Sequence, residues 1–155
     1  NGNKGYWYDG ELVTYYSFDE NNYVKLEAPD NIIDMMDGMH EAYDFQFPAA
    51  DFFYPSFTDD IMEAFDSISF LGEKTINGKV CYHIMAVNKT TTVQLWVSSD
   101  LLSLPMRLIV IQKNSNHARY EATFSDWELN PIIPEAVFEF APPPNSRLIS
   151  VLSKS

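Results

Sequence analysis

The residues best suited to chemistry in this chain are Cys81 and His83, which lie two positions apart in a segment rich in β-forming residues. Because alternate side chains of a strand point to the same side, the thiol and the imidazole would share one face. Such a pair can form a thiolate–imidazole dyad or supply two metal ligands. No third ligand and no orienting acid stand at a diagnostic spacing, so the pattern favours a small buried thiol beside a hydrogen-bonded histidine. An enzyme that uses this pair is the weakest functional hypothesis.

Other signatures of catalysis are missing from the sequence. The carboxylate pairs Asp19–Glu20 and Asp59–Asp60 fall in a predicted turn and at a predicted helix N-terminus, where acidic residues are solvated or favour the helix dipole. There is no glycine-rich phosphate loop, no nucleophile elbow and no zinc-binding histidine–glutamate motif. We therefore expect no catalytic residue, no metal site and no cofactor.

Length, charge and cysteine content restrict the class of protein. The chain has 155 residues, of which 46% are hydrophobic, and this predicts one globular domain over residues 1–155. The formal net charge of −12 repels phosphate backbones and anionic membrane surfaces, so we expect no nucleic-acid partner. A single cysteine excludes a disulfide framework. No segment approaches the roughly 18 apolar residues of a membrane-spanning helix.

The elements that would position Cys81 and His83 are the strands of residues 70–127. Asn77-Gly78 stands between two β-prone segments, and this dipeptide is the strongest local signal for a two-residue hairpin. Polar clusters at 88–91, 98–100 and 114–117 separate three further β-prone segments. Because strands joined by such short turns must run antiparallel, the region predicts a meander of about five strands.

The preceding residues predict a hairpin and then helices. Asp9-Gly10 lies within a predicted hairpin over 5–17, and a third strand is predicted over 23–28. Asp30 is the expected N-cap of a helix whose apolar face carries residues such as Met35 and Met39.

Shorter elements are predicted on either side of the meander. A helical turn is expected over 49–54, and Thr58 is expected to cap a second helix that runs through Phe65. After the meander, residues 137–140 predict a short strand and residues 147–152 a last edge strand. The resulting fold class is α+β, with an antiparallel sheet and two or three short helices packed on one face. The family resemblance described below implies that this sheet is curved and that the helices cover its concave face.

The methionine- and phenylalanine-rich helices are the most suggestive feature for function. Ordinary packing of helices on a sheet explains them at least as well, but methionine side chains can also repack around variable apolar ligands. On the second interpretation the helices form a lid and the sheet a floor, although the pattern does not say which sheet face is concave. The lid candidates are Met35, Met36, Met39, Phe53, Phe57, Met62 and Phe65, and the floor candidates are Met85, Leu95, Met106, Leu108 and Phe124.

The order of motifs along nearly the whole chain resembles the DUF2092 family of predicted periplasmic proteins. The most specific parts are Gly78–His83, Leu95–Leu108 and Phe124–Pro143. That family is in turn similar to the LolA-like lipoprotein carriers, whose fold is an unclosed half-barrel with helices lying over an apolar cavity. The resemblance implies a bacterial envelope protein with a lidded hydrophobic groove, and it brings no catalytic residue with it.

The resemblance also predicts a difference at the N-terminus. Family members have an N-terminal helix and several strands before the part that matches Tyr6, and we expect this chain to lack them. The sheet edge near residues 5–17 would then be exposed, which favours pairing with another chain.

Two functions of different kinds follow. The first is non-enzymatic binding or carriage of an apolar small molecule, a lipid or an acylated protein in the periplasm. The alternative is a polypeptide-binding sensor or interaction module that uses an exposed sheet edge.

Overall fold

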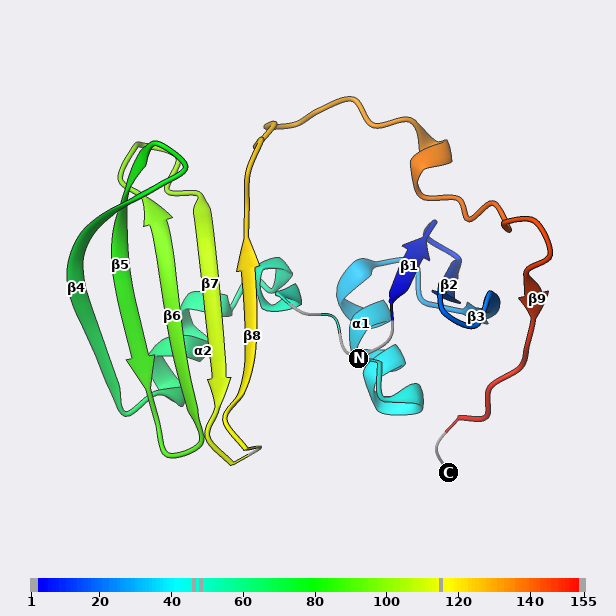
Figure 1. Cartoon of the computed structure of the whole chain (residues 1–155), viewed down its shortest axis with the longest axis horizontal. Helices are drawn as coiled ribbons and strands as arrows, with labels where there is room; N and C mark the ends of the chain where they lie inside the picture. The colour runs from blue at the N-terminus through cyan, green and yellow to red at the C-terminus, as the bar shows by residue number, and fades with distance from the viewer. Residues whose placement is uncertain (1–2, 46, 48, 115, 154–155) are drawn as a thin grey trace. The chain divides into compact units, whose positions relative to one another are not determined.

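The chain forms two compact units in the computed structural model (Figure 1), which describes residues 3–45, 47, 49–114 and 116–153. One unit consists of Asn1–Phe47 together with Asn130–Ser155, and the other of Pro48–Leu129. Each contains an open, mostly antiparallel sheet and one α-helix among the described residues, so the predicted α+β class is confirmed. That the whole chain is one domain stays a prediction.

The unit of residues 48–129 is built on the predicted five-stranded meander. Its antiparallel strands stand in sequence order: β4 (Ser67–Ile76), β5 (Lys79–Val87), β6 (Thr91–Ser98), β7 (Pro105–Gln112) and β8 (Ala118–Thr123). The first hairpin turns at Asn77 and Gly78, with φ of 47° and 79°. Both angles are positive, as the Asn-Gly dipeptide predicts.

Two helical segments precede this sheet, η1 (Ala50–Phe53) and α2 (Phe57–Ala64). The predicted cap at Thr58 is wrong, because the helix begins at Phe57 and its N-cap is Ser56, two residues earlier than predicted. The Ser56 hydroxyl donates a hydrogen bond of 2.7 Å to the Asp60 carboxylate. Serine and threonine are both favourable N-caps, so the sequence alone did not separate them. Thr58 therefore lies inside the helix.

The two faces of the five-stranded sheet carry different side chains. One face presents Ile84, Val93 and Leu95, and we call it the inner face because α2 and η1 lie over it. The other face, the outer face, holds a buried cluster centred on Cys81 and Trp96; its other members are Met106, Ile109, Ile76 and Ile111. Alternation along each strand separates the two sets.

A bulge between β6 and β7 modifies this alternation. Trp96 pairs with Arg107 and Val97 with Pro105, so Met106 has no partner of its own on β6. The extra residue lets Met106 join Trp96 on the outer face, while Pro105 lies on the inner face. Bulges re-aim side chains in this way.

The unit of residues 1–47 and 130–155 has a four-stranded sheet in the order β1-β2-β3-β9. Its strands are β1 (Lys4–Tyr8), β2 (Leu12–Ser17), β3 (Asn22–Glu27) and β9 (Arg147–Leu148). The predicted hairpin and third strand are confirmed. The predicted edge strand over 147–152 is reduced to two residues, and it pairs in parallel with β3.

Two other local predictions in this unit are wrong. Asn31 rather than Asp30 caps α1 (Ile32–Tyr43), because the Asn31 Oδ1 accepts a hydrogen bond of 2.9 Å from the Asp34 amide. The expected strand over 137–140 is instead preceded and partly replaced by the 3-10 helix η2 (Glu135–Val137). The prolines on both sides of that segment restrict it to turns and extended backbone.

Aromatic side chains pack both faces of this sheet. Tyr6 stands 5.5 Å from Phe45 and 5.1 Å from Phe47, ring centre to ring centre. On the opposite face Phe140 packs against Trp7 at 5.0 Å. The Trp7 ring also lies over Gly5, where an added Cβ would approach it to 2.6 Å, so a larger residue at this strand position would require the Trp7 ring to move.

Candidate functional site

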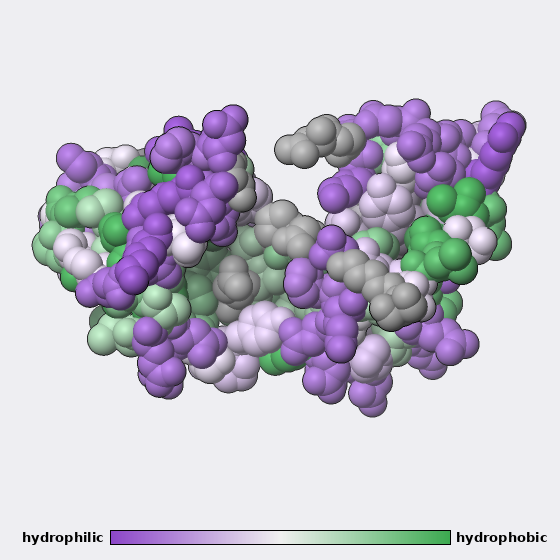
Figure 2. All heavy atoms as spheres, turned by 90° about the horizontal axis from the view of Figure 1, so that it is seen from below, coloured by the Kyte–Doolittle hydropathy of each residue, from purple (hydrophilic) through white to green (hydrophobic). Residues whose placement is uncertain are grey.

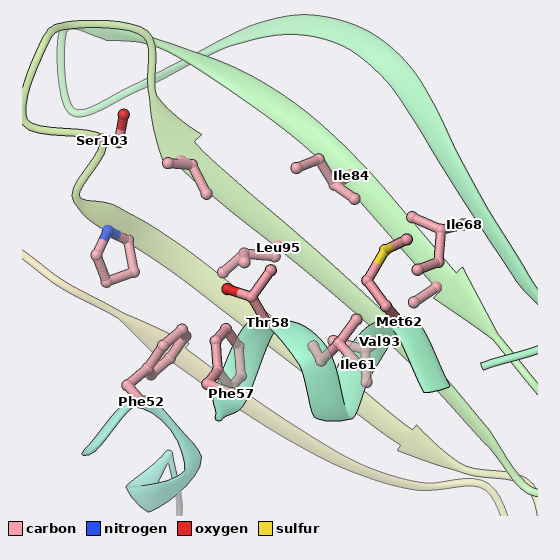
Figure 3. A pocket seen from close by; sticks show the side chains of 13 residues that line it. Phe52, Phe57, Thr58, Ile61, Met62, Ile68, Ile84, Val93, Leu95 and Ser103 are labelled. Carbon is pink, nitrogen blue, oxygen red and sulfur yellow. The ribbon is translucent and has the colours of Figure 1, made fainter. Parts of the chain in front are cut away.

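An apolar cavity of 410 Å³ lies between the inner face of the five-stranded sheet and the helical segments η1 and α2 (Figure 3). Of its thirteen lining residues, eleven are apolar and the other two are Thr58 and Ser103. No lining residue carries a charge. Ligand pockets in proteins occupy roughly 300–1,000 Å³ and are lined mainly by apolar side chains, so this cavity is large enough for a small apolar ligand.

Helical and strand periodicities together create the cavity wall. In α2, Phe57, Ile61 and Thr58 share the side that faces the sheet, as residues one turn apart on a helix do. Alternate residues of the strands point back at them, among them Val93 and Leu95. The complete lining is Phe52, Phe57, Thr58, Ile61, Met62, Ile68, Ile84, Ala86, Val93, Leu95, Val97, Ser103 and Pro105.

The cavity is accessible to solvent along α2. Met62 lines it and is nevertheless 64% exposed, and Ile68 on β4 is 39% exposed. Helix α2 contributes no fully buried residue. A helix whose sheet-facing side chains, such as Phe57 and Ile61, are only half-buried gains less from packing, which is the main source of helical stability in proteins. Hydrophobic groups at the surface of this unit are visible as green areas in Figure 2.

The structure brings three of the twelve predicted site residues together at the cavity. Phe57 and Met62 form part of the helical wall, and Leu95 forms part of the floor. Met85 on β5 and Met106 on β7 have their side chains on the outer face. Met85 pairs with Gln94, and Met106 belongs to the cluster around Cys81. The other predicted residues of this unit do not line the cavity: Phe53, Phe65, Leu108 and Phe124.

The remaining predicted lid residues belong to the other unit. Met35, Met36 and Met39 are 4–5% exposed on α1 and lie within the unit of the four-stranded sheet. Their spacing on one helical face was predicted correctly. Burial to this degree is typical of core side chains, and these methionines do not line the 410 Å³ cavity.

Sequence reasoning did not name most of the cavity floor as site residues. Ile84 and Ala86 alternate with Cys81 and His83 on β5, so the strand period already placed them on the opposite face. Val93 and Val97 share the alternation that selected Leu95. No local signal marks Ser103, which enters the lining because the turn before β7 brings it there.

Cys81 and His83 occupy the outer face, and each has its own local partner. Cys81 is fully buried, its Sγ donates to the Lys79 carbonyl at 3.4 Å, and burial raises the pKa of its thiol. The His83 ring stacks on Trp96 with 4.1 Å between ring centres, and its Nε2 lies 3.0 Å from the Gln94 Oε1. Among the described residues, no group of three or more His, Cys, Asp or Glu side chains could hold a metal ion.

Next to the stacked His83 and Trp96 rings, charged side chains on the outer face interact with one another. The Arg107 guanidinium lies 5.2 Å from the centre of the Trp96 ring. It also pairs with Glu121, which pairs in turn with Arg119. The hydrogen bond from Arg107 is the main cause that lowers the pKa of Glu121. The outer face is therefore closed by mutual side-chain contacts, whereas the inner face encloses a void.

Comparison with known proteins assigns the sequence to a family. The model of a family described as "Predicted periplasmic protein (DUF2092)" matches residues 1–152. The chain belongs to the DUF2092 family. Its membership agrees with a periplasmic location, as the family description states. No curated protein matches the chain. Within the described parts of this DUF2092 protein, no helix is both long and apolar enough to cross a membrane.

Proposed function

We propose that this protein binds or carries an apolar ligand, such as a lipid or the acyl chain of a lipoprotein, without catalysing a reaction. The observation that carries the proposal is the open 410 Å³ cavity with eleven apolar lining residues and no charged one. Burial of hydrocarbon contributes about 25 cal/mol per Å² of apolar surface. An acyl chain therefore needs no ion pair in order to bind there usefully.

The relation to LolA-like carriers forms part of this proposal. In it, the five-stranded sheet acts as the open floor of a half-barrel, and η1 with α2 acts as the lid. The weak burial of α2 supports a lid that moves aside for a ligand, because a helix with no buried residue is displaced at small cost. In this proposal Met62 is the lid residue with the most conformational freedom, since methionine is unbranched and adapts to irregular shapes.

Competing functions have less support. An enzyme based on Cys81 and His83 would need an accessible thiolate, but the Cys81 thiol is fully buried and its pKa is raised. A polypeptide-binding module would use a sheet edge. The predicted edge near residues 5–17 corresponds to β1, which stands at the end of the four-stranded sheet and remains a candidate for pairing. A second candidate is β4, where Phe70 is 63% exposed and Leu71 43%. A bulge beside Phe70 interrupts this edge, and bulges hinder the addition of another strand.

The direct experiment is to identify what the purified protein holds. Organic extraction followed by mass spectrometry is expected to yield a co-purifying lipid, and delipidated protein is expected to bind the neutral fluorophore N-phenyl-naphthylamine. If extraction gives nothing and the fluorophore does not bind, the proposal is refuted. Peptide binding that is unaffected by added lipid would support the interaction module instead.

A matched pair of variants on α2 tests whether binding occurs in this cavity. Met62→Glu introduces a charge at the cavity wall, and we expect it to weaken fluorophore binding at least about tenfold, because an unpaired charge beside a buried apolar ligand is costly. Ala64→Glu introduces the same charge on the same helix at a position outside the lining. It should leave binding within about twofold of the wild type. Equal effects of the two substitutions would contradict binding at this site.

A further inference from the structure

The two ends of the cavity differ in chemistry. Thr58 and Ser103, its only polar lining side chains, lie toward the same end, where α2 begins and the chain enters β7 (Figure 3). Neither hydroxyl has a hydrogen-bond partner within the described part of the chain. The opposite end is formed by Met62, Ile68 and Ala86. A ligand that lies along the cavity therefore meets hydroxyl groups at one end and hydrocarbon at the other.

The charged side chain next to the hydroxyl end is acidic, because Asp59 follows Thr58 on α2. The Asp100 carboxylate belongs to the outer-face side of the sheet: it accepts a hydrogen bond from Ser98, which pairs with Cys81, and Lys79 lies 3.9 Å from it. The cavity lining itself carries no charge, so an anionic head would find no counterion there.

Basic residues are found at the other end. The Asn88 side chain donates a hydrogen bond of 2.9 Å to the carbonyl of Ala64, the last residue of α2. Lys113 Nζ donates to the Asn88 carbonyl at 2.6 Å, and Lys89 belongs to the same turn. Glu63 and Asp66 flank the same end of α2, so a head drawn there would meet charges of both signs. Hydroxyl groups are missing from the lining at this end.

We propose that the cavity takes a single-chain amphiphile whose head is uncharged and hydrogen-bonds at the Thr58–Ser103 end, with its tail toward Met62 and Ile68. The inference rests on the proposed function of the cavity and adds the chemical class of its ligand. An ionised head drawn among uncharged lining residues would lose its hydration without gaining a counterion. Hydroxyl groups both donate and accept, so two of them suit an alcohol, ester or amide head.

The test compares two ligands with the same tail and different heads. Delipidated protein with bound N-phenyl-naphthylamine is titrated with dodecanoyl glycerol or with dodecanoate, at pH 8 and low ionic strength. We expect the neutral glyceride to displace the fluorophore at a concentration roughly fivefold lower, because the net charge of −12 repels the anion at low ionic strength and the lining offers it no counterion. Raising the salt concentration should reduce this difference.

Substitution of the hydroxyl groups tests the position of the head. Thr58→Val combined with Ser103→Ala should raise the half-displacing concentration of dodecanoyl glycerol about threefold or more and leave that of dodecanoate unchanged. The matched control is Thr92→Val, an isosteric change at a residue paired with Ile111 on the outer face, and it should change neither value. Far-ultraviolet circular dichroism checks that each variant is folded.

The outcomes separate this inference from the proposed function. Equal displacement by the two ligands, or no effect of the double substitution, overturns the inference while leaving apolar binding intact. Preference for dodecanoate that is lost in Lys89→Gln/Lys113→Gln also overturns it, because the head would then lie at the Asn88 end. If the fluorophore does not bind to the wild type, the proposed function itself is refuted.

Discussion

A leucine at position 86 should be accepted by the fold, although Ala86 is only 3% exposed. Ala86 points from β5 into the cavity, so the added side chain occupies space that is now empty. Each buried carbon contributes about 0.8 kcal/mol, which gives roughly 2.4 kcal/mol for the three carbons added. Lost rotamer freedom offsets about 0.5–1 kcal/mol of this gain. We expect Ala86→Leu to be neutral or to stabilise its unit by up to about 1.5 kcal/mol.

A leucine at position 81, on the other face of the same strand, should have the opposite effect. Cys81 has no solvent exposure, and its side chain belongs to a cluster with Trp96, Met106 and Ile109. Cys81→Leu therefore overfills a packed cluster, which destabilises proteins by about 1–3 kcal/mol. The difference between the two variants measures how empty the inner face is.

Denaturant unfolding of delipidated protein provides the assay. In a Trp7→Phe background the remaining tryptophans, Trp96 and Trp127, both lie in the unit that carries the cavity, so fluorescence follows that unit. We expect the midpoint of Ala86→Leu to equal or exceed that of the background protein and the midpoint of Cys81→Leu to fall. If Ala86→Leu destabilises the unit as much as Cys81→Leu does, the space under α2 is packed and the reasoning is refuted.

Three further predictions concern the rest of the structure. The Cys81 thiol should react with a thiol-specific reagent only as the protein unfolds, because it is buried and its pKa is raised; fast labelling of native protein at pH 8 would contradict this. Arg107 holds the pKa of Glu121 below its ordinary value of 4.5, so the folded state should lose stability as the pH falls below that value. In thermal unfolding measured at a series of pH values, Glu121→Gln should not show this loss of stability. Asn31→Ala should cost about 1 kcal/mol through loss of the α1 cap, and an unchanged urea midpoint by circular dichroism would exclude the cap as a stabilising contact.

Much of the fold could be predicted because local signals agreed with the tertiary arrangement. The Asn77-Gly78 turn and the polar clusters between strands gave the order and direction of β4 to β8. Helix α1 was predicted from the spacing of its methionines. Its N-cap was misplaced by one residue, because the side chains of Asp30 and Asn31 are both good N-cap acceptors.

Long-range associations could not be predicted in the same way. Nothing in the sequence near Arg147 indicates that β9 pairs with β3, because that contact joins residues far apart in the chain. Likewise, the methionines of α1 and Met62 of α2 both stand on amphipathic helices, yet they belong to different units. Local periodicity shows which face of a helix is apolar, but it does not show which sheet that face meets.

The cavity illustrates the same division between local and tertiary information. Strand alternation identified Val93, Leu95 and Val97 as one face, and all three line the cavity. Met106 was grouped with Leu108 from that alternation, but the bulge opposite Trp96 moves its side chain to the outer face. A bulge changes the face of a residue without a distinctive local sequence, so this residue was misplaced.

The methyl groups of the methionines provide the most direct test that this cavity binds an apolar ligand. The chain has six methionines, and of these only Met62 lines the cavity. In protein labelled with carbon-13 at the methionine methyl groups, titration with dodecanoyl glycerol should shift the Met62 resonance and leave those of Met35, Met36, Met39 and Met106 in place. Shifts confined to the α1 methionines, or no shift of Met62 at saturating ligand, would contradict binding between α2 and the five-stranded sheet.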